Sequence, residues 1–414
     1  MARAQDLLAQ PLTLPNGTRL PNRLAKSALS ETLGTMDNRV TSKLVRLYEC
    51  WARGGTGLLV TGNVMIDRRA LGEPGNVVVE DERDLALLKA WADGATRHGA
   101  AIWAQLNHPG KQSPKGLNKQ NISPSAIPFK ADMQAFFDTP REMTEAEIED
   151  VIRRFAVTAG IIKKAGFSGV QIHGAHGYLV GQFLSPKHNI REDGWGGTAE
   201  KRRRFVLEVY RAIRAEVGPG FPVGIKLNSA DFQRGGFTEE ESLATIEALA
   251  AVGIDMIEIS GGTYEAPAMA GVKAKESTLA REAYFLEFAE KVRETVSVPL
   301  MVTGGFRSLG AMGNALASGA MDMVGLGRPL CIEPDASLRL LAGEEMRHRV
   351  KPIVTGIGMV DRMALMEVSW YARQMHRMAV GKSPKPNESP LWSLAATVLG
   401  NVRGTLQTRR LRAS

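Results

Sequence analysis

The feature that most constrains the fold of this chain is a repeated alternation between short apolar runs and helical segments. Eight strand-like runs recur along the 414 residues, at 23–30, 57–63, 101–107, 169–173, 222–228, 255–260, 299–304 and 322–327. Apolar strands that alternate with helices indicate a parallel sheet, because each crossover returns the chain to the same edge. Eight such units fit a closed (β/α)8 barrel, the TIM-barrel architecture.

A doubly wound open sheet is the alternative arrangement, but no G-x-G-x-x-G follows the first strand, as a dinucleotide-binding sheet would need. Residues 12–20 (LTLPNGTRL) predict a β-hairpin with a type I′ turn at Asn16-Gly17. We expect this hairpin to plug or cover the barrel, since a two-stranded ribbon is too small to be a domain. The predicted division is a barrel over 1–340 and a helical, basic extension over 341–414.

Two capping boxes and one long loop complete the outline. Thr144 with Glu147, and Thr238 with Glu241, predict helix starts. Residues 108–143 are rich in Pro, Lys and Asn and show little periodicity. Loops of that length in compact proteins are usually functional or mobile, and we expect this one to shape a site.

Charge and cysteine content narrow the functional classes. From Met346 onward there are 12 Lys/Arg against 3 Asp/Glu, which leaves 40 against 41 of the totals of 52 and 44 for the rest of the chain. The barrel is therefore about neutral, and nothing in it predicts nucleic-acid binding. Two cysteines cannot form a disulfide framework, and neither a membrane-spanning run nor a signal-peptide pattern is present. We expect a cytoplasmic protein.

The basic extension admits two interpretations. Residues 370–382 are helical and basic, and residues 391–414 can form an amphipathic helix that ends in a basic run. We expect a helix that packs on the barrel or forms an interface between the subunits of a homo-oligomer. Reversible contact with an acidic membrane surface is the alternative.

Polar residues and glycines stand at the carboxyl ends of the predicted strands, where TIM barrels place their active sites. They are Ser30, Gly62, Gln105, His173 with His176, Lys226, Ser260, Gly304-Gly305 and Gly327-Arg328. Gly304 and Gly305 follow the seventh strand, and Gly327 with Arg328 follows the eighth. These residues predict a phosphate site, because backbone N–H groups can approach an anion there and Arg328 can bond it. Tight turns are the structural alternative for either set alone.

Gln105 and Lys226 suit a flat heterocycle. The glutamine amide can both donate and accept hydrogen bonds, and a lysine cation would stabilise negative charge on a reduced ring. A polar rim residue and a surface lysine are the alternatives, although Lys226 lies inside the apolar run VGIKLN.

His173 and His176 are separated by two residues just past a predicted strand. A metal-dependent barrel enzyme is one interpretation, but a catalytic zinc needs a third protein ligand, and His188 is the only nearby histidine. The other interpretation is a pair of N–H donors aimed at a substrate oxygen, with Tyr178 as a proton donor on the same segment. We favour the second and predict no metal.

Together these motifs resemble those of the old yellow enzyme family, the FMN-dependent NAD(P)H:flavin oxidoreductases and ene-reductases. The resemblance covers about residues 10–340 in the expected order. It rests on NRLAKSALS from Asn22, QLNHPG from Gln105, HGAHGYL from His173 with the loop that follows it, and GLGRPL from Gly325. The HGAHGY segment with its loop is highly specific, whereas the glycine sets alone would not identify the family.

The resemblance implies a (β/α)8 barrel that binds FMN non-covalently and takes hydride from NADPH or NADH. It places Gln105 at the flavin pyrimidine edge, Lys226 near N1 and Ser30 near O4 and N5. The remaining implied FMN-binding residues are Ser27, Ala28 and Gly62 along the ring, and Gly304, Gly305, Gly327 and Arg328 at the phosphate. Lys226 departs from the arginine of many relatives and Ser30 from the cysteine of some, and both changes bear on the flavin potential.

The resemblance also implies a reaction, the reduction of the C=C bond of an activated alkene such as an enone. His173 and His176 would hold the substrate oxygen, hydride would come from flavin N5, and Tyr178 would protonate the α-carbon. Two other functions stay open. One is a flavin-dependent reductase or dehydrogenase for another substrate class, and the other is a flavin-binding sensor or assembly protein with little turnover.

Overall fold

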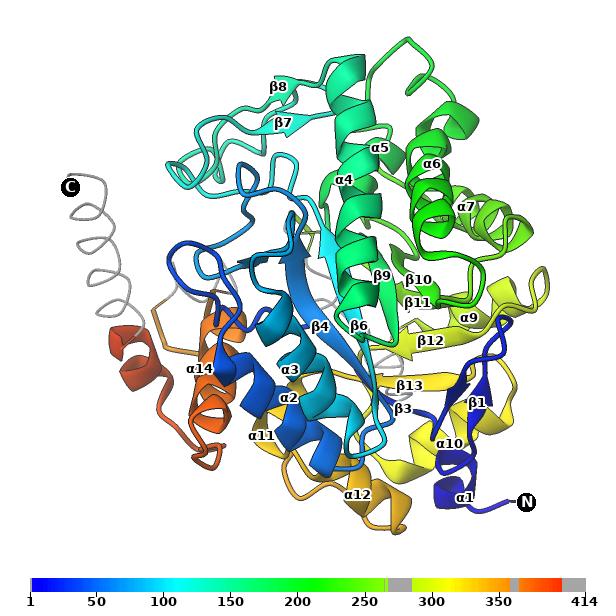
Figure 1. The fold of residues 1–414 in the computed structure, drawn as a ribbon, viewed down its shortest axis with the longest axis vertical. Coiled ribbons are helices and arrows are strands. Elements are labelled where there is room, and N and C mark those ends of the chain that lie inside the picture. The colour runs from blue at the N-terminus through cyan, green and yellow to red at the C-terminus, as the bar shows by residue number, and fades with distance from the viewer. Residues whose placement is uncertain (1, 264, 267–284, 358–364, 397–414) are drawn as a thin grey trace.

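The chain folds around a closed parallel barrel (Figure 1). A computed structural model describes residues 2–263, 265–266, 285–357 and 365–396. Neighbouring strands pair in chain order, and the last pairs with the first to close the ring. The barrel strands are β3 (Leu24–Lys26), β4 (Leu58–Met65), β6 (Ala101–Asn107), β9 (Gly169–Gly174), β10 (Val223–Asn228), β11 (Met256–Ser260), β12 (Leu300–Thr303) and β13 (Met323–Leu326). The predicted (β/α)8 barrel is confirmed.

Helices surround the barrel and complete the eight units (Figure 1). They are α2 (Ser42–Arg53), α3 (Leu85–Thr96), α4 (Glu145–Lys164), α6 (Ala199–Val217), α7 (Glu239–Ala251), α9 (Leu286–Arg293), α10 (Leu309–Ala317) and α11 (Arg328–Ile332). Shorter elements decorate this frame: α1 (Ala4–Leu8), α5 (Leu179–Leu184), α12 (Ala336–Leu341), β5 (Val77–Val78), β7 (Ile122–Ser123) and β8 (Arg141–Glu142). Both predicted capping boxes are present, at the starts of α4 and α7.

The N-terminal hairpin pairs β1 (Leu12–Thr13) with β2 (Arg19–Leu20), as predicted, but its turn differs from the prediction. A type I′ turn needs positive φ at both central residues. Only Gly17 has it, with φ 86°, while the Leu14 N–H donates to Thr18 O at 2.8 Å across a three-residue loop. The prediction of a type I′ turn was wrong because the Asn16 side chain instead accepts from the Thr18 N–H at 3.1 Å, which stabilises the longer loop.

The hairpin seals the amino-terminal end of the barrel with apolar side chains. Leu12, Leu14 and Leu20 of the hairpin join one buried cluster with Ala25, Leu58, Val60, Trp103, Met256, Met301 and Met323 of the strands. Trp103 fits because two neighbours are glycines: a Cβ on Gly169 would lie 2.5 Å from its Nε1, and one on Gly224 would lie 2.7 Å from its Cζ3. This apolar plug leaves the opposite, carboxyl-terminal end of the strands for chemistry.

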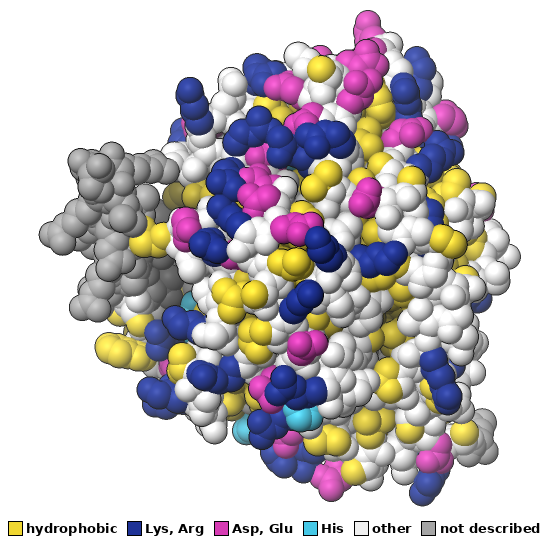
Figure 2. Space-filling view, in the orientation of Figure 1, with side chains coloured by type: hydrophobic (Ala, Val, Ile, Leu, Met, Phe, Trp, Pro, Cys, Tyr) yellow, Lys and Arg dark blue, Asp and Glu magenta, His cyan; other side chains and the backbone are white. Residues whose placement is uncertain are grey.

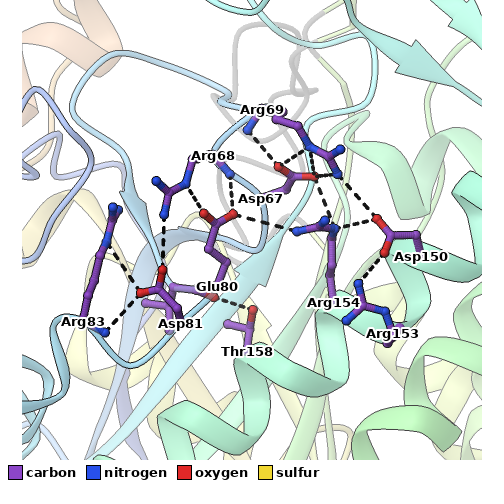
Figure 3. Close-up of polar contacts among 11 residues, drawn as sticks. Asp67, Arg68, Arg69, Glu80, Asp81, Arg83, Asp150, Arg153, Arg154 and Thr158 are labelled. Carbon is purple, nitrogen blue, oxygen red and sulfur yellow. Dashed lines mark hydrogen bonds and ion pairs between the residues drawn. The ribbon is translucent and has the colours of Figure 1, made fainter.

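An ion-pair network fastens the segment after β4 to helix α4 (Figure 3). Arg154 of α4 lies 3.4 Å from Asp67 and 3.8 Å from Glu80, and its Nε donates to Asp150 at 2.7 Å. Single exposed pairs stabilise little, but Asp67 is buried and shared by two arginines, which makes this network a firmer contact.

Helix α14 (Leu365–Ala379) lies within the predicted C-terminal extension and packs against α2 and α11 (Figure 1). Trp370, Tyr371 and Met375 are among its buried side chains. Most of the amphipathic helix and basic run predicted over 391–414, namely residues 397–414, lies outside the described residues. On the face drawn in Figure 2, basic and acidic side chains are interspersed. Of the helices in the described ranges, none is long and apolar enough to cross a bilayer.

Candidate active site

A continuous chain of polar side chains crosses the barrel interior, one layer beyond the apolar plug toward the carboxyl ends of the strands. Gln105 Nε2 donates to Gln171 Oε1 at 2.7 Å, and Gln171 Nε2 donates to Glu258 Oε2 at 2.8 Å. On the other side, the Thr303 hydroxyl donates to Glu258 Oε1 at 2.7 Å and lies 2.7 Å from Ser27 Oγ. Five strands or strand ends supply this chain, so the side chains all point into the barrel.

Lys226 joins the chain at its centre. Its Nζ lies 3.0 Å from Glu258 Oε1, and the Glu258 side chain is fully buried. Parallel pairing sets Lys226 directly opposite Glu258 on β11 and His173 on β9. The cation predicted at this position is therefore present, but it is one half of a buried ion pair.

A bulge in β4 shapes the next part of the site. The register between β4 and β6 shifts between Val60 and Asn63, and the Thr61 hydroxyl accepts from the Gln105 N–H at 2.9 Å. The Gly62 N–H turns instead to Glu31 Oε1, at 2.8 Å. A Cβ at Gly62 would lie 2.3 Å from Leu29 O, so the backbone requires glycine there.

Lys26 supports this bulge from beneath. Its Nζ donates to Tyr48 Oη and to Val60 O, both at 2.9 Å, and lies 3.5 Å from Glu31. Tyr48 in turn donates to Glu31. Complete burial lowers the pKa of Lys26, and the Glu31 carboxylate partly offsets that effect. These four side-chain contacts hold the loop after β3 against β4.

The predicted catalytic residues lie together at the carboxyl end of β9 and in the turn that follows it. The His173 ring centroid is 4.6 Å from that of Tyr178 and 5.4 Å from that of His176. His176 adopts φ 61°, and its N–H donates to Asn228 Oδ1 at 3.2 Å, which anchors the turn. Tyr178 begins helix α5 as its N-cap residue.

Both histidines are neutral at ordinary pH. Burial lowers the pKa of His173 well below its usual value, with further lowering by His176 and Lys226. Burial also lowers the pKa of His176 well below its usual value, and Lys226 adds to it. Each neutral imidazole carries one N–H donor, and that donor can hold a substrate oxygen.

Asparagines that the sequence interpretation missed complete this end of the barrel. Asn63 Nδ2 donates to Tyr178 Oη at 3.3 Å, and Asn107 Nδ2 donates to Asn63 Oδ1 at 3.1 Å. Ser260, which stood at a predicted strand end, lies 2.8 Å from His176 Nε2. Asn107 Oδ1 is buried and has no hydrogen-bond partner within the described part of the chain.

The glycines predicted to hold phosphate lie at the ends of β12 and β13. Gly304 and Gly305 have φ of 118° and 94°, a conformation that glycine alone adopts at little cost. Gly327 is the N-cap residue of α11, and Arg328 is the first residue of that helix. Arg328 Nη1 donates to Glu367 Oε2 of α14 at 2.9 Å.

Helix α14 also contacts the loop that follows β3. His376 Nε2 lies 2.7 Å from Glu31 O and 3.2 Å from Thr32 Oγ1. Helix α14 therefore hydrogen-bonds both Arg328 and the loop after β3. Sequence reasoning missed Glu367 and His376, because their partners are 39 and 345 positions away.

The remaining predicted residues are also placed. Ser27 is buried, and Ala28 packs on the edge of the apolar plug. Ser30 hydrogen-bonds Glu73, whose pKa burial raises. His188 contacts Lys111, with Nδ1 3.1 Å from Nζ, and its Nε2 lies 3.6 Å from Glu265.

Glu258, Gln171 and Thr303 were not predicted as site residues. A signal for two of them existed: Glu258 lies within the apolar run DMIEIS and Gln171 within GVQIH, as Lys226 does within VGIKLN. A charged or amide side chain in a barrel strand must find a buried partner.

A parallel barrel with amide and lysine groups on its strands, and left-handed glycines after β12, is the architecture of a barrel enzyme that can bind a phosphorylated cofactor. The model of the NADH:flavin oxidoreductase / NADH oxidase family matches residues 7–346, and the chain belongs to this family, which includes the old yellow enzymes. Its cofactor is FMN, and NADH or NADPH is the hydride donor.

Two fungal relatives illustrate the similarity. The NADH-dependent flavin oxidoreductase iccE of Talaromyces variabilis is 40% identical over 352 residues, which is 79% of this chain and 84% of the relative. The NADH-dependent flavin oxidoreductase iliE of Hypocrea jecorina (strain QM6a) is 35% identical over 389 residues, which is 88% of this chain and 94% of the relative. The solved old yellow enzyme homologue from Zymomonas mobilis superposes with a TM-score of 0.71 at 23% identity, over 83% of this chain and 94% of that chain, which shows the shared fold.

The residues present fit FMN. The Gln105 amide and the Lys226 ammonium can bond the polar edge of a flavin ring, and the left-handed backbone at Gly304 and Gly305 carries no side chain that would block a phosphate. The unpartnered Asn107 Oδ1 marks a further polar atom at this end that a bound molecule can satisfy.

Proposed function

We propose that this protein reduces the carbon–carbon double bond of activated alkenes, such as α,β-unsaturated ketones. The supporting observation is the convergence of two neutral imidazoles and one buried phenol at the carboxyl end of β9. Bound FMN supplies the hydride chemistry between the nicotinamide and the substrate. The side chains of the protein bind, orient and protonate.

His173 and His176 hold the carbonyl oxygen of the substrate in this proposal. The His173 Nδ1 accepts from the Ala175 N–H at 3.4 Å, which leaves the ring proton on Nε2 for donation. Negative charge grows on the oxygen as hydride adds to the β-carbon, so both N–H donors bind the transition state more strongly than the ground state. Lys226 lies beside His173 on the neighbouring strand.

Tyr178 gives a proton to the α-carbon. Its hydroxyl accepts a hydrogen bond from Asn63 Nδ2, which stabilises the phenolate that remains when the proton leaves. Its ring packs on His173, so the proton donor and the oxygen-holding group stay at a fixed separation. FMN-binding roles for Ser27, Ala28, Ser30, Gly62, Gln105, Lys226, Gly304, Gly305, Gly327 and Arg328 are part of the same proposal.

Anaerobic spectroscopy of the two half-reactions tests the function. We expect NADH, the donor named for both fungal relatives, to bleach the flavin absorbance, and 2-cyclohexenone then to restore it without oxygen. Bleaching that no activated alkene reverses would exclude alkene reduction while leaving the flavin oxidoreductase assignment in place.

Tyr178→Phe separates the proton donor from the rest of the site. Loss of a positioned general acid costs about 10²–10⁴-fold, so re-oxidation by 2-cyclohexenone should slow by at least 100-fold while reduction by NADH stays within about twofold. Tyr210→Phe is the matched control, because its hydroxyl bonds Gly253 O on the outer helix layer and should affect neither half-reaction. Equal slowing of both half-reactions in Tyr178→Phe would refute the assigned role.

A further inference from the structure

Glu258 is the centre of the polar chain inside the barrel. Three donors converge on its carboxylate: Gln171 Nε2 at 2.8 Å, Thr303 Oγ1 at 2.7 Å and Lys226 Nζ at 3.0 Å. The side chain is fully buried; β10 and β12, which supply Lys226 and Thr303, flank β11, and β9, which supplies Gln171, is the next strand beyond β10. An ionised carboxylate only accepts hydrogen bonds, so it dictates the direction of every bond that ends on it.

The first consequence is the orientation of two amides. Gln171 must present its NH2 group to Glu258, and its carbonyl oxygen therefore faces Gln105. Gln105 must then donate with its own NH2 group, which leaves its carbonyl oxygen for a donor outside the chain. The acid thus fixes an amide orientation that a glutamine at a strand end would otherwise choose freely.

The second consequence concerns the opposite arm. The Thr303 hydroxyl donates its only proton to Glu258. It therefore accepts a hydrogen bond from Ser27 rather than donating one. Ser27 Oγ is then left as an acceptor for any further partner. Both arms end in oxygen acceptors because both begin at the same carboxylate.

The third consequence concerns charge. Lys226 and Glu258 form a buried ion pair, so the net charge of the pair is zero where the lysine alone would contribute one positive charge. Inside a low-dielectric barrel the partner charge changes the local potential far more than it would at the surface. A reduced, negatively charged ring is stabilised less by the pair than by an isolated cation.

We propose that Glu258 is a positioning residue that sets the reduction potential of bound FMN, by offsetting the charge of Lys226 and by fixing the hydrogen-bond direction of Gln105 and Ser27. This inference rests on the proposed placement of Gln105 and Lys226 beside the flavin and is independent of the substrate. The effect has a sign: Glu258 keeps the flavin harder to reduce.

The test compares the midpoint potential of the FMN-loaded wild type with that of Glu258→Gln, by equilibration with a reference dye. Glutamine keeps the shape and removes the charge. We expect the two-electron reduction equilibrium to shift at least tenfold toward the reduced flavin, which corresponds to a rise of about 30 mV. Sulfite affinity of the oxidised flavin should rise at least tenfold as an independent readout, and Glu258→Asp, which retains the charge, should recover most of the wild-type potential.

A second comparison avoids an unpaired buried lysine. Lys226→Met alone leaves the carboxylate unopposed, and the double variant Glu258→Gln/Lys226→Met removes both charges. The double variant should have the higher potential of the two, again by at least tenfold in the equilibrium. A two-electron reduction equilibrium of Glu258→Gln within twofold of the wild-type value would overturn the inference. A double variant whose flavin is no easier to reduce than that of Lys226→Met would overturn it as well.

Lys226→Met distinguishes the two ways to fail. If it alters the potential and Glu258→Gln does not, the inference about Glu258 is wrong while the flavin placement stands. If neither alters it, the placement of the ring beside Lys226 is wrong as well. Alkene turnover enters neither measurement, so failure of the proposed substrate class remains a separate result.

Discussion

Met256 and Glu258 are two residues apart on β11 and project into the same barrel interior, yet their surroundings differ completely. Met256 packs among the apolar side chains under the hairpin, whereas Glu258 accepts three polar donors. The same step separates Trp103 from Gln105 on β6. Because strand side chains alternate with a period of two, one such step carries each strand from a layer that stabilises the barrel to a layer that holds its chemistry.

Moving charge into the apolar layer should have the largest effect. Met256→Glu would bury a carboxylate with no donor among its apolar neighbours. We expect the free energy of unfolding in urea to fall by about 4 kcal/mol or more, or the protein not to fold. Met256→Leu is the matched control and should cost less than about 1.5 kcal/mol. A loss below 1 kcal/mol for Met256→Glu would show that the amino-terminal end tolerates polarity and would remove the contrast between the layers.

A pair of variants on β6 should sharpen the contrast. Trp103→Ala leaves a large cavity in the plug and should lower the free energy of unfolding by about 3–5 kcal/mol, with FMN affinity almost unchanged. Gln105→Ala should cost only about 1–2 kcal/mol, for the donor that Gln171 loses, but should weaken FMN binding at least about tenfold. Urea titration and quenching of flavin fluorescence measure the two quantities, and the reverse pattern would contradict the division.

A fall in pH should destabilise the loops at the carboxyl-terminal end of the barrel strands before the amino-terminal end. Burial lowers the pKa of His108 to about 4 and that of His188 to about 3, and both lie in loops at the carboxyl-terminal end. A folded pKa below the unfolded value of about 6.5 means that the unfolded chain binds more protons below pH 6.5. Stability is therefore full above pH 6.5 and falls as the pH drops toward 4 and 3, by roughly 1 kcal/mol per histidine over the first unit.

Hydrogen exchange at pH 7 and pH 5.5 locates this loss. Protection should fall in the loops around His108 and His188 before it falls in the hairpin, whose apolar contacts do not titrate. Equal loss at both ends would mean that the acid effect is global.

The strands and the catalytic residues could be predicted from the sequence because each depends on a short local pattern. All eight strands follow from apolar runs, and His173, His176 and Tyr178 could be grouped because a single turn carries all three. The pairing of Lys226 with Glu258 depends on the register between β10 and β11, which composition does not reveal. The hairpin turn was mispredicted because one side-chain bond of Asn16 decides between two loop lengths.

The contact between His376 and Glu31 spans 345 positions, and β13 must also reach back to β3 to close the ring. During synthesis the loop after β3 emerges 345 positions before its partner His376 and stays without that contact until α14 has left the ribosome. Contacts of such high sequence separation form late and slowly. The loop after β3 is therefore made long before helix α14 can hold it in place, so a product that stops before α14 would carry this loop without the helix that secures it.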